Sequence, residues 1–437
     1  MEMLGSIGIF VALGIIIFLA LRSYSILIIA PICSILVILA NKMNITQAML
    51  TANNSFMAGV GSFVSSYLMV FLLGAVLAKL LEDSGAAQAI AKWVLSMTGK
   101  DSPYKVMVAL FGVSIILTYG GVSLFVAIFA LVPLARPIFK EMNMPWHLAM
   151  IPIGAGLGTF TMTMLPGTPS VQNYVPTIPL GTTLTAAPVV GLVCTAAVVI
   201  FALWYMKHEI TKAVKSGEKY VESAADAALN QERELPSLGI SLFPMIVLIG
   251  IIFVGSFMKV NNIILIALVV SIVIALIVLN KYIANILGAL NTGATNSLGP
   301  VMLTAVAIGF GSVVMAAPGF GIIGKWFLSI PGSPLISLSV VTAFFSAVTG
   351  SATGGLGIVM KGFADTYLAM GLAPEAIHRV AAIASGFGSM PHSGAILATL
   401  ALMGLNHKNG YRHLFMTNIC GSFIGLVVGL VLCSIIY

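Results

Sequence analysis

The sequence predicts an all-α polytopic membrane protein with two inverted repeats of five transmembrane helices, each repeat carrying one re-entrant hairpin. Three observations lead to this fold class. Of 437 residues, 59% are hydrophobic and only 8% are charged, which lies far outside the range of soluble domains. Apolar windows long enough to cross a bilayer recur along the chain. Segments rich in Gly, Ser and Thr interrupt the apolar sequence at corresponding places in the two halves.

The bulk composition argues against several other classes. The net charge of +7 is expected to reflect basic cytoplasmic loops and not nucleic-acid binding. The first residues, MEMLGS, place an acid and no base before the first apolar run, so this run is expected to be a crossing and not a cleaved signal peptide. The cysteines all lie in apolar segments without metal-like spacing, which predicts packing roles for Cys33, Cys194, Cys420 and Cys433.

Ten apolar segments are predicted to cross the membrane. In the first half they lie near 5–20, 24–40, 57–81, 148–165 and 184–206. In the second half they lie near 240–258, 262–279, 299–317, 377–390 and 414–436. The fourth and ninth are expected to be broken helices, because prolines at Pro166, Pro169 and Pro391 interrupt them. Shorter segments of mixed polarity are expected to be interfacial helices, at 44–56, 86–98, 282–297 and 319–330.

The stretch VTGSATGGLG, from Val348 to Gly357, predicts the tip of a re-entrant hairpin that spans 334–370. Glycine weakens a helix, and freed backbone groups are tolerated at membrane depth only inside the protein or along a watery cavity. The apolar sequence on both sides would form two short helices that meet at this tip. The alternative is an ordinary loop between two crossing helices.

A second copy of this unit favours the hairpin. Residues 104–136 show the same layout around ILTYGGVSLF, and Gly120-Gly121 recurs 234 residues later as Gly354-Gly355. Five crossings per repeat is an odd number, so the second copy must enter the membrane upside down, as in many secondary transporters. The predicted division is a first repeat at 1–206, a polar linker at 207–236 and a second repeat at 237–437.

Basic residues set the predicted orientation. With each hairpin returning to its own side, 15 of the 20 Lys and Arg residues fall on the side of the linker and five on the other. The positive-inside rule therefore places the linker in the cytoplasm and both termini outside. The first hairpin would then enter from the cytoplasm and the second from outside.

The two hairpin tips and the two broken helices are expected to meet near the middle of the membrane. Half-helix N-termini there would present free N–H groups and a positive dipole end to a carboxylate, and hydroxyl side chains can bond a carboxylate or a substrate hydroxyl. Arg136 and Arg379 are expected nearer the interfaces, which leaves backbone N–H groups as the donors. The alternative role of the hydroxyl residues is helix packing. The predicted substrate-binding residues are Tyr119, Gly120, Gly121, Ser123, Thr168, Ser170, Asn173, Ser351, Thr353, Gly354, Gly355, Ser389, His392 and Ser393.

His392 directly follows the proline of the second broken helix, and a histidine at that depth is costly unless it is used or satisfied. It is the candidate for proton coupling, with a satisfied structural role as the alternative. His147 and His378 are expected to cap helices at the interface. Asp365 lies four residues after Lys361, which predicts a local ion pair.

No catalytic or cofactor motif is present in the sequence. HExxH, the GxSxG elbow and a Walker lysine are absent, so no metal, no cofactor and no ATP-driven step is expected, and an ion gradient or simple facilitation remains. The sequence therefore argues against an enzyme. An intramembrane enzyme built on Ser389 and His392, and a cation/proton antiporter with Asp365 as its acid, are the alternatives.

Three stretches carry a family resemblance. They are GGVSLFVAIFALVPLARPIFKEM with the following PIGAGLG, the second-half GSATGG, and SMPHSGAI followed by ALMGLNHKNGY. Over nearly its whole length the chain resembles the gluconate permease (GntP-type) family, within the ion transporter superfamily of elevator-type carriers. The resemblance implies uptake of sugar acids or small hydroxy acids with protons. It also implies a homodimer in the inner (plasma) membrane, with scaffold and transport domains.

One departure from the family pattern bears on the substrate. Gluconate-type members tend to carry a histidine-rich HPGP-like segment after the first broken helix, whereas this chain has LPGTPSVQN from Leu165 to Asn173, without histidine. A smaller, less hydroxylated acid is therefore expected, as in members regarded as 3-hydroxybutyrate permeases. The resulting prediction is a symporter for a small hydroxy monocarboxylate, such as 3-hydroxybutyrate or a gluconate-like acid, coupled to protons or, alternatively, to sodium.

Overall fold

A computed structural model of the protein describes residues 2–22, 24–87, 89–90, 93, 96, 102–119, 124–168, 170–223, 234–258, 263–328 and 330–437. Over these residues the chain is helical and contains no strand, which confirms the predicted all-α class. Helical runs that are long and apolar enough to cross a membrane alone are Met3–Leu21, Gln47–Asp83, Pro188–Ser216, Ile286–Ala316 and His407–Ile436. Shorter apolar helices of 10–17 residues accompany these five runs in the described chain.

The first half of the chain begins and ends with long helices and has short, broken helices before its last crossing. Its elements are α1 (Glu2–Leu21), α2 (Ile26–Ala40), a π-helix (Gln47–Thr51), α3 (Phe56–Asp83), α5 (Pro103–Tyr119), α6 (Leu124–Glu141), a 3₁₀ turn (Trp146–Ala149), α7 (Met150–Gly158), α8 (Phe160–Thr163), α9 (Val171–Tyr174), α10 (Thr177–Leu180) and α11 (Pro188–Ser216). The helices α5 and α6 are the arms of the predicted first hairpin. Its tip, Gly120 to Ser123, lies outside the described residues.

The second half shows the same order of long, paired and broken helices. Its elements are α12 (Leu238–Phe257), α13 (Ile263–Val278), a 3₁₀ turn (Asn280–Tyr282), α14 (Ile286–Ala316), α15 (Pro318–Leu328), α16 (Pro334–Thr349), α17 (Ala352–Ala369), α18 (Pro374–Ala384), a 3₁₀ turn (Ser385–Gly388), α19 (Gly394–Met403), a π-helix (His407–Tyr411), α20 (Arg412–Leu414), a second π-helix (Phe415–Cys420) and α21 (Gly421–Ile436). The antiparallel pair α16 and α17 forms the second hairpin. The inverted relation of the two halves stays a prediction.

All ten segments predicted to cross the membrane coincide with helices, but one predicted boundary is wrong. Residues 282–297 were expected to form a separate interfacial helix, and most of them instead belong to the continuous 31-residue helix α14. Packing against α3 accounts for the difference, because α3 and α14 share the largest contact between any two described helices. At Gly293 a side-chain carbon would lie only 2.7 Å from the Cα of Val76, so the absence of a side chain permits this approach. The segment 86–98 is only partly described.

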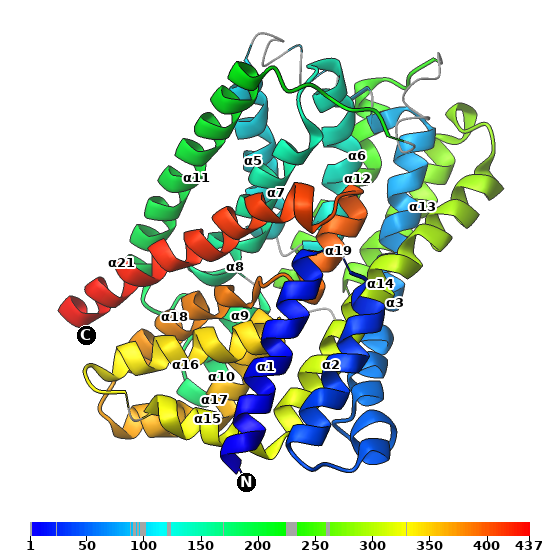
Figure 1. The fold of residues 1–437 in the computed structure, drawn as a ribbon. Coiled ribbons are helices and arrows are strands. Elements are labelled where there is room, and N and C mark those ends of the chain that lie inside the picture. Colours follow the sequence, from blue (N-terminus) through cyan, green and yellow to red (C-terminus); the bar gives the residue numbers. More distant parts are fainter. Residues whose placement is uncertain are drawn as a thin grey trace.

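The helices form two groups that draw on both halves of the chain (Figure 1). The first group, α1–α3 with α12–α14, is built around the α3–α14 pair. The second group contains α5, α7, α11, α16–α18 and α21, with α11 and α21 on the left of Figure 1. The helices α6 and α19 lie between them and contact α3 and α14, respectively. The interface between the groups is therefore lined by the hairpin and broken-helix segments.

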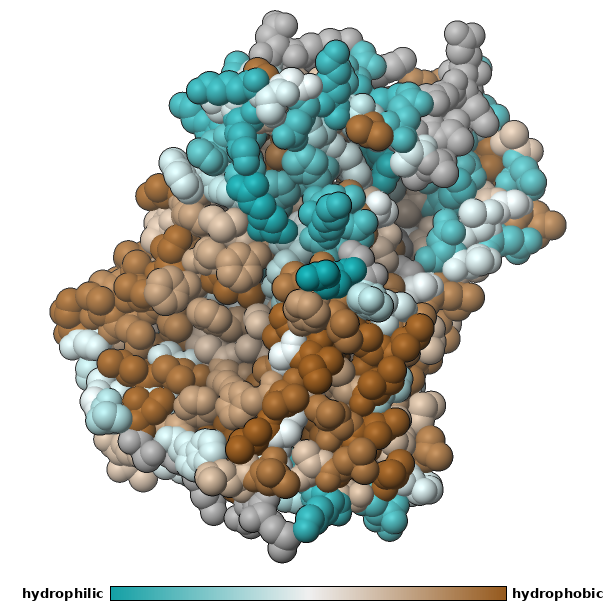
Figure 2. Space-filling view, viewed as in Figure 1, coloured by the Kyte–Doolittle hydropathy of each residue, from teal (hydrophilic) through white to brown (hydrophobic). Residues whose placement is uncertain are grey.

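The surface has a broad apolar belt between two unequal polar ends (Figure 2). The larger polar end, at the top of Figure 2, contains the C-terminal end of α11, and the N-terminus lies at the opposite end of the molecule. Exposed apolar residues cover both long helices and hairpin arms, as Ile200 on α11 and Ile116 on α5 illustrate. A belt of this kind is what a bilayer requires of a spanning protein.

A chain of polar side chains ties the start of the linker to the helices below it. His147 bonds Glu218 through Nε2 at 3.2 Å and His413 through Nδ1 at 2.9 Å, and the two imidazole rings stack. The Tyr205 hydroxyl lies 3.0 Å from the other ring nitrogen of His413. Slight burial raises the pKa of Glu218, but hydrogen bonds from His147 and Ser216 outweigh it and lower the pKa overall. The expected helix-capping role of His147 is thus wrong.

The contact between α3 and α14 yields a matched pair of variants. At Gly59 a side chain would collide with Ser312 and with the Cα of Gly309, which would lie 2.9 Å away, whereas at Gly61, on the same helix, nothing lies within 4 Å. We expect Gly59→Val to lower the thermal unfolding midpoint of the detergent-purified protein, because overpacking costs about 1–3 kcal/mol. Gly61→Val should leave the midpoint unchanged, and equal midpoints for both variants would contradict the described packing.

Candidate functional site

A cavity of about 470 Å³ lies between the two helix groups, a size typical of small-molecule sites. The first group supplies an apolar wall and two polar side chains, from Phe63, Tyr67, Ile264, Thr304 and Ile308. The hairpins and broken helices supply most of the remaining lining, from Thr118, Leu124, Gly158, Met162, Thr163, Ser170, Val171, Gln172, Gly350, Ser351, Ala352, Thr353, Gly354, Gly386, Gly388, Ser389, Ser393, Gly394, Ala395, Ile396, Thr399 and Asn418. The cavity therefore lies among the hairpin and broken-helix segments.

The tip of the second hairpin presents a helix N-terminus to the cavity. The helix α16 ends at Gly350, whose φ of +58° is in the left-handed region that favours glycine. Ser351 then caps α17, and its Oγ accepts a hydrogen bond from the Gly354 backbone N–H at 3.0 Å. The first turn of α17 lines the cavity through Ala352 and Thr353. Free N–H groups and the positive end of the helix dipole thus face the cavity.

A second helix N-terminus reaches the same cavity from the second broken helix. Ser393 and Gly394, at the start of the ten-residue helix α19, line the cavity. Thr304 of α14 donates a hydrogen bond to the Gly394 carbonyl at 3.0 Å, which joins this segment to the first helix group. Ser389 is held from the other side, because the Tyr411 hydroxyl donates to its carbonyl at 3.1 Å. Two helix N-termini therefore converge on one space.

The described lining contains hydroxyl and amide groups and no charged side chain. No Asp, Glu, Lys, Arg or His belongs to it, so an ionised ligand there would meet only dipoles and neutral donors. An uncompensated ionic charge costs several kcal/mol on leaving water. The two helix N-termini offer compensation to an anion and none to a cation.

The structure places the predicted site residues in three different settings. Six of them line the cavity, namely Ser170, Ser351, Thr353, Gly354, Ser389 and Ser393. Gly120, Gly121 and Ser123 lie outside the described residues. Five others lie away from the lining, namely Tyr119, Thr168, Asn173, Gly355 and His392. Of these, Gly355 lies against the Ser346 backbone and allows α16 and α17 to pack closely.

His392 lies beneath the tip of the second hairpin. Its ring is fully buried, packs edge-on against Phe310, and donates from Nε2 to the Val348 carbonyl at 3.2 Å. A side-chain carbon at Gly350 would lie 2.9 Å from this ring. Within the described chain, the Nδ1 atom has no hydrogen-bond partner. The ring therefore stabilises the last turn of α16 through its hydrogen bond to the Val348 carbonyl.

A buried polar network joins the two broken helices, and the sequence analysis missed it. Arg379 on α18 is fully buried and donates from Nη2 to the Ala186 carbonyl at 2.6 Å. Its Nη1 donates to the Thr163 carbonyl and to Asn173 Oδ1, each at 3.3 Å. His378, also fully buried, bonds the same Asn173 oxygen at 3.1 Å. His378 was expected to cap a helix at the interface, and the capping role is wrong because its ring bonds Asn173 instead. The expected depth of Arg379 near an interface stays a prediction.

The reason for this error is the loop that follows the first broken helix. It folds over the start of α18, where Thr182 bonds His378 at 2.7 Å. Asn173 holds the loop by donating to the carbonyls of Thr168 and Leu184, at 2.9 and 2.7 Å. The start of α18 is therefore covered by protein, although its sequence resembles an exposed helix start.

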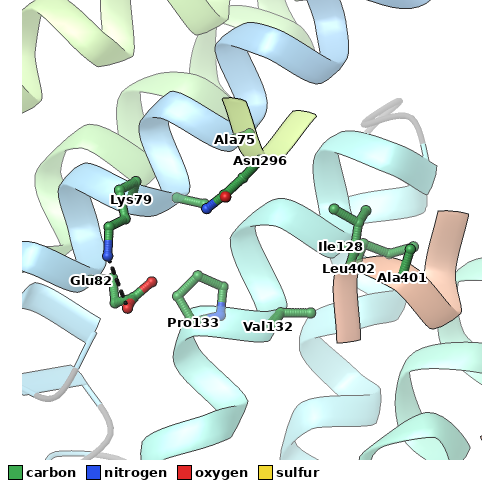
Figure 3. A pocket seen from close by; sticks show the side chains of 10 residues that line it. Ala75, Lys79, Glu82, Ile128, Val132, Pro133, Asn296, Ala401 and Leu402 are labelled. Atoms are coloured by element: carbon green, nitrogen blue, oxygen red, sulfur yellow. Dashed lines mark hydrogen bonds and ion pairs between the residues drawn. The ribbon is translucent and has the colours of Figure 1, made fainter. Parts of the chain in front are cut away.

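A second, smaller cavity of about 270 Å³ lies between α3, α6, α14 and α19 (Figure 3). Lys79 and Glu82 project into it from α3, opposite Pro133 of α6. The Lys79 Nζ atom lies 3.3 Å from Glu82 Oε1 and 2.9 Å from Asp83 Oδ1. Both acids follow Lys79 by about one helical turn on the same helix. The same four helices also line the larger cavity, at other positions.

The chain matches a permease family model along nearly its whole length and named relatives over smaller shares. The family model of the GntP family permease matches residues 3–436. The uncharacterized transporter YxjC of Bacillus subtilis is 31% identical over 93% of this chain and 94% of its own length. The Gnt-II system L-idonate transporter of Escherichia coli is 27% identical over 69% of this chain and 70% of its own. A gluconate permease of Bacillus licheniformis is 25% identical over 71% and 75%, respectively.

Among solved structures, the YdaH transporter of Alcanivorax borkumensis is similar to this chain at a TM-score of 0.44 and 16% sequence identity. The match covers 88% of this chain and 87% of the transporter.

The buried network predicts a stability effect at Arg379. Arg379→Met leaves the carbonyls of Ala186 and Thr163 without this donor, and each unsatisfied buried group costs about 1–3 kcal/mol. We expect Arg379→Met to have a clearly lower thermal unfolding midpoint in detergent than the wild-type protein. The midpoint of Arg379→Lys should lie between those of the wild type and Arg379→Met, because lysine keeps part of the donor set. Arg22→Met, at an exposed position after α1, is the control. An unchanged midpoint for Arg379→Met would contradict the described network.

Proposed function

This chain belongs to the GntP permease family, and on that premise we propose that it is a symporter for a small hydroxy monocarboxylate, such as 3-hydroxybutyrate or a gluconate-like acid. It is a multi-pass membrane permease. The observation that carries the proposal is the uncharged cavity faced by two helix N-termini. The gluconate and L-idonate transporters among its relatives act on sugar acids, which supports an acid as substrate.

The chemistry of the lining supports an anion with one apolar side. Backbone N–H groups at the starts of α17 and α19 can donate hydrogen bonds to a carboxylate, and the hydroxyls of Thr353 and Ser393 add neutral donors. The opposite wall carries Phe63, Ile264 and Ile308, which suits a methyl or methylene group. A short hydroxy acid fits this division better than a fully hydroxylated chain, whose outer hydroxyls would face apolar side chains.

We propose an elevator mechanism for transport, with the two inverted repeats supplying both domains. The cavity lies between the two helix groups, so a displacement of the second group along α3 and α14 would carry the bound acid with it. In this proposal the first group is the scaffold of a homodimer in the plasma membrane. The linker is cytoplasmic and both termini are outside, because the positive charges gather on the linker side.

Two alternatives receive less support from the geometry. A cation/proton antiporter would need an acid at the site, and Asp365 lies exposed on α17, outside the cavity lining. An intramembrane enzyme would need a base aligned with Ser389, and the described hydrogen bond of His392 goes to Val348 instead. Both observations favour the transport of an acid.

The proposal is tested by uptake into proteoliposomes. Labelled 3-hydroxybutyrate, lactate, butyrate and gluconate are offered with an imposed proton gradient, an imposed sodium gradient, or neither. Accumulation of hydroxy acids under a proton gradient is the expected result. Failure to take up any of these acids would overturn the proposed function.

The coupling role of His392 makes a separate prediction. If His392 carries the coupled proton, His392→Gln should abolish proton-driven accumulation and leave substrate exchange intact, because exchange needs no net proton movement. Counterflow and gradient-driven uptake in the same proteoliposomes measure the two activities. Retention of both activities would assign the ring to its structural position beneath Gly350.

The hairpin tip predicts a loss of affinity at Thr353. Thr353→Ala removes one donor from the cavity, and a hydrogen bond to a charged group contributes about 1.5–3 kcal/mol, or roughly ten- to a hundred-fold in affinity. We expect substrate binding to weaken by about that factor without loss of folded protein. Thr366→Ala, on the same helix and outside the lining, is the control. Equal affinity in both variants would place the anion elsewhere.

A further inference from the structure

We propose that Asn418 recognises the substrate hydroxyl, to which it donates a hydrogen bond from its side-chain amide. The inference rests on the proposed function and adds a specificity role to it. Asn418 lies outside both hairpins and both broken helices.

The local helix geometry turns Asn418 into the cavity. It lies in the π-helix Phe415–Cys420, directly before α21, and is 5% exposed while it lines the cavity. The wider turn of a π-helix changes the direction in which side chains leave the helix, and such turns frequently occur at functional sites. The amide therefore faces the ligand space from a helix that also carries the neighbouring Thr417.

In the described arrangement, Nδ2 is the end of the Asn418 amide that points away from Thr417. The Thr417 hydroxyl lies 2.9 Å from both Asn418 Oδ1 and the His413 carbonyl, and these two acceptors share its single proton. Nδ2 lies 3.5 Å from the Ser389 hydroxyl, at the outer limit of a hydrogen bond. Since the amide nitrogen carries two N–H groups, at least one of them is available to a ligand.

Two glycines on α7 leave room for this arrangement. A side-chain carbon at Gly158 would lie 2.7 Å from Asn418 Nδ2, and one at Gly154 would lie 2.9 Å from the Thr417 hydroxyl. Any larger residue at either position would displace the amide or the hydroxyl that orients it. The close approach of α7 thus depends on both glycines and holds Asn418 in place.

Asn418 is also close to the proposed carboxylate site. Ser389, its neighbour in the cavity, follows Gly388, which lies directly against the Ala352 backbone at the start of α17. An acid whose carboxylate binds the α17 N-terminus would therefore have its next carbons beside Asn418. A hydroxyl on one of these carbons can accept from Nδ2, whereas a methylene group cannot.

The test compares 3-hydroxybutyrate with butyrate, which lacks the hydroxyl. Dissociation constants for both acids are measured on purified wild-type protein, Asn418→Ala and Asn418→Asp, with the exposed Asn291→Ala as control. Asn418→Ala should weaken 3-hydroxybutyrate binding by about five- to ten-fold and leave butyrate binding unchanged. Asn418→Asp keeps the side-chain size but replaces the donor by a negative charge, so both acids should bind more weakly.

The outcomes separate this inference from the function on which it rests. Loss of the preference for the hydroxy acid in Asn418→Ala, with Asn291→Ala unchanged, supports the role of Asn418. Unchanged preference in folded Asn418→Ala, or unchanged affinity in folded Asn418→Asp, overturns that role and leaves the proposed function intact. Binding of neither acid by the wild-type protein overturns this inference, and failure of lactate and gluconate as well overturns the proposed function.

Discussion

Every backbone group that a broken helix releases inside a membrane must find a partner within the protein or in a watery cavity, and this requirement shapes the centre of the molecule. The Arg379 guanidinium and the Asn173 amide donate to carbonyls of the first broken helix and its loop. The His392 ring donates to the last turn of α16. Some polar side chains that the sequence suggests as substrate-binding groups thus bond the broken backbone instead. The polar side chains that remain available to a substrate are those that make no hydrogen bond to the broken backbone.

The sequence reveals the overall fold because the relevant signals are local. The length of each apolar run predicts a helix wherever it occurs, and Gly350 ends α16 through its own backbone conformation. Ser351, Thr353 and Gly354 line the cavity because they form the tip at which the helix restarts. The inverted relation of the repeats and the elevator motion are larger-scale properties, and they stay predictions.

Features that depend on contacts between distant segments could not be read from the sequence. The burial of Arg379 depends on a loop nearly 200 residues earlier that folds over the start of α18, as the 193-residue separation from Ala186 shows. The unbroken course of α14 depends on its contact with α3. Asn418 lies in the π-helix before α21, and its place in the cavity lining depends on how this helix packs against distant segments. In each case the sequence shows the residue but not its surroundings.

The uncharged cavity has an electrical consequence. Since the described lining contributes no ionised side chain, the empty cavity carries no charge of its own, and a bound ion would bring the charge on which the membrane voltage acts there. One elementary charge that crosses 100 mV changes in free energy by about 2.3 kcal/mol. An interior-negative voltage would therefore expel a lone monocarboxylate, whereas an acid accompanied by one proton crosses as a neutral pair. A second accompanying cation would make the same voltage a driving force for uptake.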